Sequence, residues 1–259
     1  GINYSKDMVT TKQFFTDNFP SSEQIAKDLQ ESPFKVYHDA INVGVYDEIR
    51  SFWLDYFSKD QPQREVARGD LLLGEENFNS HADTDFWSLY RHFDFLWNVP
   101  THQLTTDIAI ELHKVRNNAL NLPEEYGLNY NPECYGFYVS TSYYPPNGMM
   151  TPHGDGYPKG KKKFQLLHFM LPITFKGQDY QDGGLVIFDK NDEKVDVDKI
   201  MKPGSIIFYD GIYKHGVEKI IPYEDKKIGR LAMFAVPVYF LKEKLPEKKN
   251  GRFSKMFSK

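Results

Sequence analysis

The sequence predicts an α+β fold that is mainly β, in which a double-stranded β-helix (jelly roll) core has N-terminal helices packed on its outside. Between Tyr135 and Phe240, short β-type runs alternate with Gly, Pro and Asp turns. Closely spaced short strands of this kind are typical of a sandwich or jelly roll and not of βαβ units. Before this region, apolar residues recur at helical spacing.

Two stretches of the N-terminal part predict core-facing helices. In residues 43–59, Val45, Ile49 and Tyr56 recur at the spacing of one helical face. In residues 102–120, a single apolar stripe runs along the helix and predicts burial of that face. The stripe consists of Leu104, Ile108, Leu112, Val115 and Ala119.

Six strands are predicted in the second half of the chain. They cover residues 135–144, 164–175, 183–189, 204–211, 215–222 and 230–240. We expect residues 1–259 to form a single domain, in which residues 1–130 are mainly helical, residues 135–240 form the jelly-roll core and residues 241–259 are a Lys-rich tail. The acidic run 189–198 lacks the glycine and final glutamate of a calcium-binding loop, so it is interpreted as a charged hairpin.

Composition narrows the possible partners. The net charge of -4 gives no basic footprint, so we expect no nucleic-acid partner. No apolar run approaches the roughly 18 residues of a membrane helix, so no membrane partner is expected either. The single cysteine, Cys134, favours a reducing compartment and therefore a cytoplasmic protein, although the start at Gly1 is compatible with a missing upstream targeting segment. The sequence predicts no oligomeric state.

The motif His153-Gly154-Asp155 predicts half of a metal site. Side chains two apart on a strand point to the same side, so the imidazole and the carboxylate can reach one cation. The best third ligand is His215, which follows the turn at Asp210-Gly211 and opens the next strand. Two histidines and one carboxylate on one face leave three coordination positions open, which is the arrangement of non-haem Fe(II) oxygenases.

A 2-oxo acid can occupy two of those positions through its keto oxygen and the adjacent carboxylate, which leaves the third for O2. Its far carboxylate then needs a buried cation. Arg230 fits this requirement, because it lies fifteen residues after His215 and opens an apolar strand. A guanidinium matches a carboxylate with two parallel hydrogen bonds and stays charged when it is buried.

The order of these motifs resembles the Fe(II)/2-oxoglutarate-dependent oxygenase superfamily. The similarity covers residues 135–240 and comprises the HxD motif, a Gly-Gly strand, the strand KPGSIIFYDG, a histidine followed by Gly-Val, and a Gly-Arg strand. The resemblance implies an oxidoreductase, a dioxygenase that uses Fe(II), 2-oxoglutarate and O2 and releases succinate and CO2.

Residue roles follow from the same resemblance. It implies that His153, Asp155 and His215 hold the iron and that Arg230 anchors 2-oxoglutarate. Tyr144, nine residues before His153, is implied to line the co-substrate pocket.

The substrate is expected to be a small amino-acid-like molecule of specialised metabolism, oxidised at a C–H bond. Hydroxylation, desaturation and oxidative cyclisation stay open, whereas the Asp155 carboxylate argues against halogenation, because related halogenases have a small residue there. Several upstream arginines can hold a substrate carboxylate, and the sequence does not choose among them. They include Arg64, Arg68, Arg91 and Arg116.

Two other functions remain open, a peptidyl (prolyl-type) hydroxylase and a non-catalytic metal-binding protein of the cupin type. A second HxD motif, His81-Ala82-Asp83, lies in a polar stretch and is interpreted as a surface feature. His168 lies inside an apolar strand and is interpreted as a core or pocket-wall residue. His113 and Arg116, three apart on a predicted helix, are interpreted as part of its solvated face.

Overall fold

The computed structural model describes residues 14–64, 71–130, 134–156 and 166–241. The elements are α1 (Ser22–Glu31), β1 (Phe34–Tyr37), α2 (Val43–Ser58), β2 (Phe78–Asp83), β3 (Trp87–Phe95), α3 (Gln103–Ala119), β4 (Tyr135–Tyr144), β5 (Met149–His153), β6 (Leu167–Pro172), β7 (Tyr180–Phe188), β8 (Lys194–Asp196), β9 (Ile206–Asp210), β10 (His215–Pro222) and β11 (Arg230–Tyr239).

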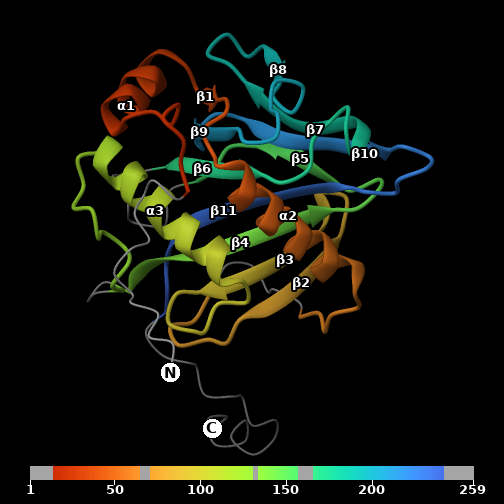
Figure 1. The fold of residues 1–259 in the computed structure, drawn as a ribbon, viewed down its shortest axis with the longest axis horizontal. Helices are drawn as coiled ribbons and strands as arrows, with labels where there is room; N and C mark the ends of the chain where they lie inside the picture. The colour runs from red at the N-terminus through yellow and green to blue at the C-terminus, as the bar shows by residue number, and fades with distance from the viewer. Residues whose placement is uncertain (1–13, 65–70, 131–133, 157–165, 242–259) are drawn as a thin grey trace, which may run out of the picture.

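The strands form one curled, antiparallel sheet of 11 strands (Figure 1). The order is β1-β9-β6-β11-β4-β3-β5-β10-β7-β8, and β2 pairs with β3. Strands far apart in the sequence therefore become neighbours. The pairing of β11 with β4 places Arg230 opposite Tyr144, and the pairing of β10 with β5 places His215 opposite His153. The sheet topology thus sets the positions of the predicted site residues.

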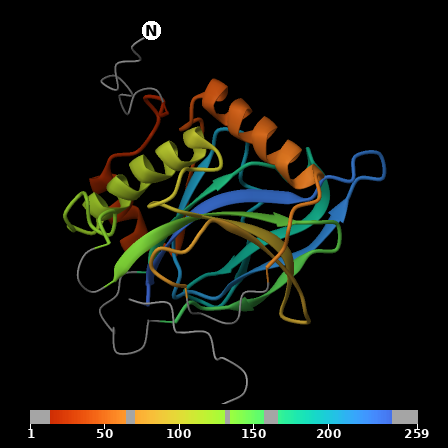
Figure 2. The same cartoon turned by 90° about the horizontal axis from the view of Figure 1, so that it is seen from below.

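Helices α2 and α3 cover one face of the sheet (Figures 1 and 2). Helix α2 buries Tyr46, Ile49 and Trp53, and α3 buries Ile108 and Leu112. These side chains belong to the largest cluster of buried apolar residues, which also contains residues from β4, β6, β9 and β11. Apolar burial at about 25 cal/mol per Å² is the main force that attaches the helices to the sheet.

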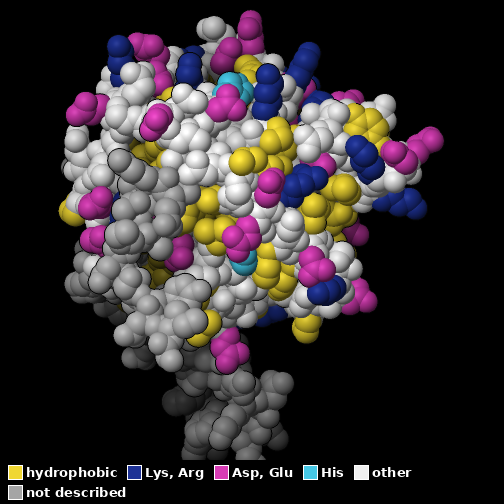
Figure 3. Space-filling view, in the orientation of Figure 1, with side chains coloured by type: hydrophobic (Ala, Val, Ile, Leu, Met, Phe, Trp, Pro, Cys, Tyr) yellow, Lys and Arg dark blue, Asp and Glu magenta, His cyan; other side chains and the backbone are white. Residues whose placement is uncertain are grey.

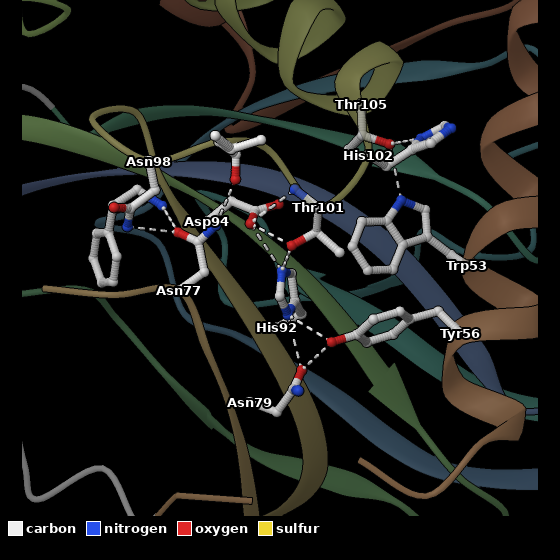
Figure 4. Close-up of polar contacts among 12 residues, drawn as sticks. Trp53, Tyr56, Asn77, Asn79, His92, Asp94, Asn98, Thr101, His102 and Thr105 are labelled. Carbon is white, nitrogen blue, oxygen red and sulfur yellow. Dashed lines mark hydrogen bonds and ion pairs between the residues drawn. The ribbon is translucent and has the colours of Figure 1, made fainter. Parts of the chain in front are cut away.

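A buried polar network fixes the helices on strand β3 (Figure 4). Both ring nitrogens of His92 form hydrogen bonds. Nδ1 lies 2.8 Å from Asn79 Oδ1, and Nε2 lies 2.9 Å from Asp94 Oδ1. The Tyr56 hydroxyl of α2 lies 3.1 Å from His92 Nδ1. Because side chains alternate along a strand, this contact turns His92 toward the helices and its neighbour Arg91 toward the opposite side of the sheet.

The sequence predicted the main elements correctly. The two predicted helices are α2 and α3, and the six predicted strands are β4, β6, β7, β9, β10 and β11. The charged hairpin is also present, with β7 paired to β8. The sequence did not predict α1, β1, β2, β3 or β5. The reason is clearest in β3, which buries polar side chains on the helix side and therefore lacks an apolar-polar alternation.

The solvated face predicted for His113 and Arg116 is wrong. The two side chains expose only 2% and 1% of their surface. Helix α3 packs against both α1 and β6, so more than one of its faces is covered. Arg116 Nε donates to the carbonyl oxygen of Leu167 at 2.8 Å, which satisfies a polar group that burial would otherwise leave unpaired.

On the face shown in Figure 3, acidic and basic side chains are interspersed. Within the described ranges, no helix has the length and apolar character needed to cross a membrane. Cys134 is buried with a free thiol. Residues 242–259, nearly all of the predicted Lys-rich tail, lie outside the described residues.

Candidate active site

Three predicted ligands meet where β5 and β10 pair. His153 ends β5, Asp155 follows two residues later, and His215 begins β10. His153 Nε2 lies 3.8 Å and His215 Nε2 lies 3.6 Å from Asp155 Oδ1. One ligand atom from each residue lies within 4.8 Å of the others, and this is the one such cluster of three found among the described residues. The sheet register thus assembles the predicted triad.

Backbone carbonyls set the tautomer of both histidines. Nδ1 of His153 lies 2.8 Å from the carbonyl oxygen of Thr151, and Nδ1 of His215 lies 2.8 Å from that of Tyr213. Because a carbonyl oxygen can only accept, each Nδ1 must donate. The Nε2 lone pairs are then free to bind a metal, as in most protein metal sites with histidine ligands.

The pKa shifts of His215 and Asp155 also suit metal binding. Burial lowers the pKa of His215, which favours the neutral imidazole that a metal requires. Burial alone would raise the pKa of Asp155, but the hydrogen bond with His168 and the nearby imidazoles outweigh it and lower that pKa. Asp155 is therefore held as a carboxylate. Two imidazoles and one carboxylate form a donor set that suits Fe(II) with positions left open.

His168 orients the Asp155 carboxylate. Its Nε2 lies 3.2 Å from Asp155 Oδ2, the oxygen that does not face the other two histidines. Gly211 makes this contact possible, because a Cβ there would overlap Asp155 Oδ2 and lie 2.7 Å from His168 Cδ2. The sequence placed His168 in the core or pocket wall but did not connect it with Asp155. The contact depends on the pairing of β6 with β9, which places His168 opposite Tyr209. The sequence does not show this pairing.

The triad opens into a cavity of about 360 Å³. This volume falls within the range of small-molecule sites. Both polar and apolar side chains line the cavity. They include His153, Asp155, His168, His215, Arg230, Tyr144, Arg91, Trp87, Leu89 and Phe234.

Arg230 lies in the same cavity, where it already forms an ion pair with a carboxylate of the protein. Its Nε donates to Asp198 Oδ2 at 2.7 Å, and its Nη2 donates to Asp198 Oδ1 at 3.2 Å. The Tyr180 hydroxyl donates to the same carboxylate. Burial alone would lower the pKa of Arg230, but the charge of Asp198 raises it. Arg230 is therefore a fixed, permanently charged group.

The guanidinium keeps one nitrogen for a ligand. Nη2 also contacts Met170 Sδ at 3.3 Å, whereas the described residues provide no hydrogen-bond partner for Nη1. Gly184 leaves space for the carboxylate of Asp198, because a Cβ at this position would overlap Asp198 Oδ2. Its φ of +99° also favours glycine. Asp198 and Tyr180 were not singled out from the sequence.

Tyr144 also lines the cavity. It lies opposite Arg230 in the strand register, and the Arg230 guanidinium carbon lies 5.9 Å from the centre of its ring. Its hydroxyl donates to Met150 Sδ at 3.7 Å. The neighbouring Tyr143 lies on the other face of the sheet, where its ring centre is 5.4 Å from that of Phe57.

The structure separates the four candidate arginines. Arg91 lines the cavity, whereas Arg116 is a buried residue of α3 that does not line it. Arg64 forms an ion pair with Glu75, and Arg68 lies outside the described residues. In the second HxD motif, His81 and Asp83 are exposed on β2, and His81 stacks on Tyr90.

No protein-family model and no curated protein matches the chain. Solved structures do match it. A prolyl-4-hydroxylase from Pseudomonas putida has a TM-score of 0.56 at 12% identity, with 86% of this chain and 100% of that chain covered. The non-haem α-ketoglutarate-dependent epimerase SnoN of nogalamycin biosynthesis has a TM-score of 0.53 at 10% identity, with coverages of 88% and 90%. The chain has the fold of the 2-oxoglutarate/Fe(II) oxygenases.

A third match is a full-length protein from Neurospora crassa, solved in a complex with α-ketoglutarate and 5-formyluracil. Its TM-score is 0.51 at 11% identity, and the match covers 83% of this chain and 76% of that chain. At these identities the likeness shows the fold. The predicted fold class and the predicted resemblance are thereby confirmed, while the roles of single residues remain predictions.

Proposed function

We propose that the chain is an Fe(II)/2-oxoglutarate-dependent dioxygenase that oxidises a C–H bond of a small amino-acid-like metabolite. One observation carries this proposal: His153, Asp155 and His215 share a cavity with Arg230, and Nη1 of Arg230 keeps its hydrogen-bond donors for a ligand. A metal store of the cupin type has no need of a buried cation beside the metal ligands, so this pairing favours the oxygenase over that alternative.

Each residue has a defined task in the proposal. The two imidazoles and Asp155 hold the iron, and Arg230 receives the far carboxylate of 2-oxoglutarate through Nη1. Tyr144 walls the cavity beside that carboxylate. Bound iron would supply the activation of O2, and the buried surroundings exclude water from the reaction.

The test is anaerobic reconstitution with Fe(II) and titration with 2-oxoglutarate, followed by the weak visible charge-transfer band of the bidentate chelate. The band is expected in the wild type and is expected to be lost in Asp155→Ala and His215→Ala. His81→Ala is the matched control, because His81 belongs to an exposed HxD motif on β2 and should leave the band unchanged.

Two other results would contradict the proposal or its ligand assignment. A wild type that binds iron but shows neither the band nor any affinity for 2-oxoglutarate contradicts the oxygenase proposal and favours the metal-binding alternative. A band that survives in His215→Ala contradicts the ligand assignment.

The size of the cavity supports a small substrate over a peptide. About 360 Å³ has to accommodate both 2-oxoglutarate and the reacting group of the substrate. The likeness to prolyl hydroxylases shows the fold alone, so it does not favour a peptidyl substrate. Succinate release can distinguish the two, because a panel of free amino acids and related acids should stimulate it, whereas proline-containing peptides should not.

A further inference from the structure

A second cation, Arg91, projects into the same cavity from strand β3. Its neighbour His92 is turned toward the helices, so Arg91 faces the interior of the curled sheet. We infer that Arg91 is the binding site for a carboxylate of the substrate, which makes the substrate a small acid with an apolar body. This inference rests on the proposed function, because it assigns the substrate of the same site.

The contacts of Arg91 leave its charge uncompensated. Its Nε and Nη2 lie 3.4 and 3.3 Å from the Ser140 hydroxyl, and Nη2 lies 3.3 Å from the Tyr138 hydroxyl. These hydrogen bonds are long and their partners are neutral. Arg91 forms no ion pair with any carboxylate in the part of the chain that the structure describes.

Aromatic rings surround the rest of the guanidinium. Its carbon lies 4.5 Å from the centre of the Phe93 ring and 5.6 Å from that of Phe234. Ring faces stabilise a cation but do not neutralise it. A half-buried cation with neutral partners, in a cavity that a ligand can enter, therefore favours an anionic ligand group.

Arg91 and Arg230 differ in a way that assigns them different ligands. Arg230 is paired with Asp198 and opposes Tyr144 in the register, whereas Arg91 opposes Ser142 from the other side of β4. With strands about 4.8 Å apart and a rise of about 3.4 Å per residue, the two Cα atoms are separated by about 12 Å. The Arg91 guanidinium turns toward Tyr138 and Phe93, whereas that of Arg230 turns toward Asp198, so the cavity offers two separate places for a carboxylate.

The cavity wall near Arg91 defines the rest of the substrate. Trp87, Leu89, Phe234 and Val236 line it and offer apolar surface. Trp87 and Leu89 precede Arg91 on the same face of β3, and β3 also pairs with β5, the strand that ends at His153. A substrate held at Arg91 by its carboxylate can therefore extend an apolar stem along β3 toward the metal ligands.

The test measures binding of three probes of increasing length, phenylacetate, 3-phenylpropionate and 4-phenylbutyrate, to the anaerobic protein loaded with Fe(II) and 2-oxoglutarate. Isothermal titration calorimetry gives the affinities, and the corresponding neutral amides are titrated in parallel. The variants are Arg91→Met, which keeps the apolar stem, and Arg91→Lys, which keeps the charge. Arg64→Met is the control, since Arg64 is bound to Glu75 and does not line the cavity.

At least one carboxylate should bind the wild type and Arg64→Met at least tenfold more tightly than its amide. Arg91→Met should lose this preference, and Arg91→Lys should retain part of it, which separates the loss of charge from a folding defect. The inference is overturned when no carboxylate binds more tightly than its amide, or when Arg91→Met binds the acids as the wild type does.

The titration of 2-oxoglutarate separates this inference from the proposed function. Its charge-transfer band should appear with the same affinity in the wild type and in Arg91→Met. A weaker response in Arg91→Met, combined with no change in Arg230→Met, would make Arg91 the co-substrate anchor and overturn the inference while the oxygenase proposal stands. Absence of the band in every protein would instead contradict the oxygenase proposal itself.

Discussion

Arg230 and Asp198 form a bidentate ion pair that is almost completely buried. Arg230 Nε lies 2.7 Å from Asp198 Oδ2, and the two side chains expose 3% and 2% of their surface. The pair fixes the guanidinium before any ligand enters, because rotation of the arginine would break two charge-assisted hydrogen bonds. A binding group that is held in place loses little conformational entropy when its ligand arrives.

Removal of Asp198 should destabilise the protein strongly. Asp198→Ala leaves the charge of Arg230 buried without a counter-charge, which is expected to lower the free energy of unfolding by about 3–5 kcal/mol. Urea denaturation measures the change. Glu218→Ala is the control, because the pair between Lys194 and Glu218 is exposed and should contribute less than about 1 kcal/mol. Equal and small decreases in the free energy of unfolding of the two variants would show that the buried pair stabilises the protein no more than the exposed pair does.

His168 is expected to strengthen metal binding without being a ligand. In His168→Phe, the hydrogen bond to Asp155 Oδ2 is lost, and affinity for Fe(II) or Mn(II) should fall about 10- to 100-fold, as is common for partners of metal ligands. Calorimetric titration with Mn(II) measures it, and His81→Phe on the exposed strand β2 is the control. An unchanged Mn(II) affinity in a folded His168→Phe would exclude this positioning role.

Gly211→Ala should damage the metal site although Gly211 has no side chain to contribute. The added methyl group would overlap Asp155 Oδ2 and lie 2.7 Å from His168 Cδ2, so the carboxylate has to move. We expect Mn(II) affinity to fall at least about tenfold. Gly44→Ala in α2 is the matched control, since no atom lies within 4 Å of its added Cβ, and it should leave metal binding unchanged and stabilise the helix by up to about 1 kcal/mol.

His113 should make stability sensitive to mild acid. Burial, and then the charge of Arg116, lower the pKa of His113 well below its usual value. The unfolded state then binds more protons between that pKa and about 6.5, so stability is complete above pH 6.5 and is lost as the pH falls below it. From pH 7.5 to 5.5 the free energy of unfolding should decrease by about 1.4 kcal/mol from this group.

The comparison of His113→Leu with the wild type isolates this contribution. Urea denaturation at pH 7.5, 6.5 and 5.5 should show a smaller loss of stability in His113→Leu. His81→Gln changes an exposed histidine on β2 and should retain the dependence of the wild type. Parallel curves for the wild type and His113→Leu would count against a neutral His113 in the folded protein.

Local patterns were sufficient for the main elements and for the proposed ligands. The apolar stripe of α3 follows from helical periodicity, and β4 follows from a β-type run bounded by turn residues; both signals depend on near neighbours in the chain. The spacing of His153 and Asp155 places both on one side of a strand end. These features need no knowledge of what packs against them.

Strand β3 shows where such patterns fail. It places Arg91 in the cavity and buries His92 among Asn79, Asp94 and Tyr56, so both of its faces are partly polar. Burial of His92 is favourable only because partners from β2 and α2 satisfy its ring, and those partners come from other parts of the chain. The same reason explains the burial of Arg116, whose Nε donates to the carbonyl oxygen of Leu167 in β6.

The sequence by itself determined two of the helices, six of the strands, the jelly-roll class and a chemically sensible set of ligands, because periodicity and residue chemistry are local properties. Only the tertiary structure decided that His168 contacts Asp155, that Asp198 accompanies Arg230, and that Arg91 alone among the four candidate arginines lines the cavity within the described residues. Those relationships depend on strand register, and register is set by the packing of segments that lie far apart in the chain.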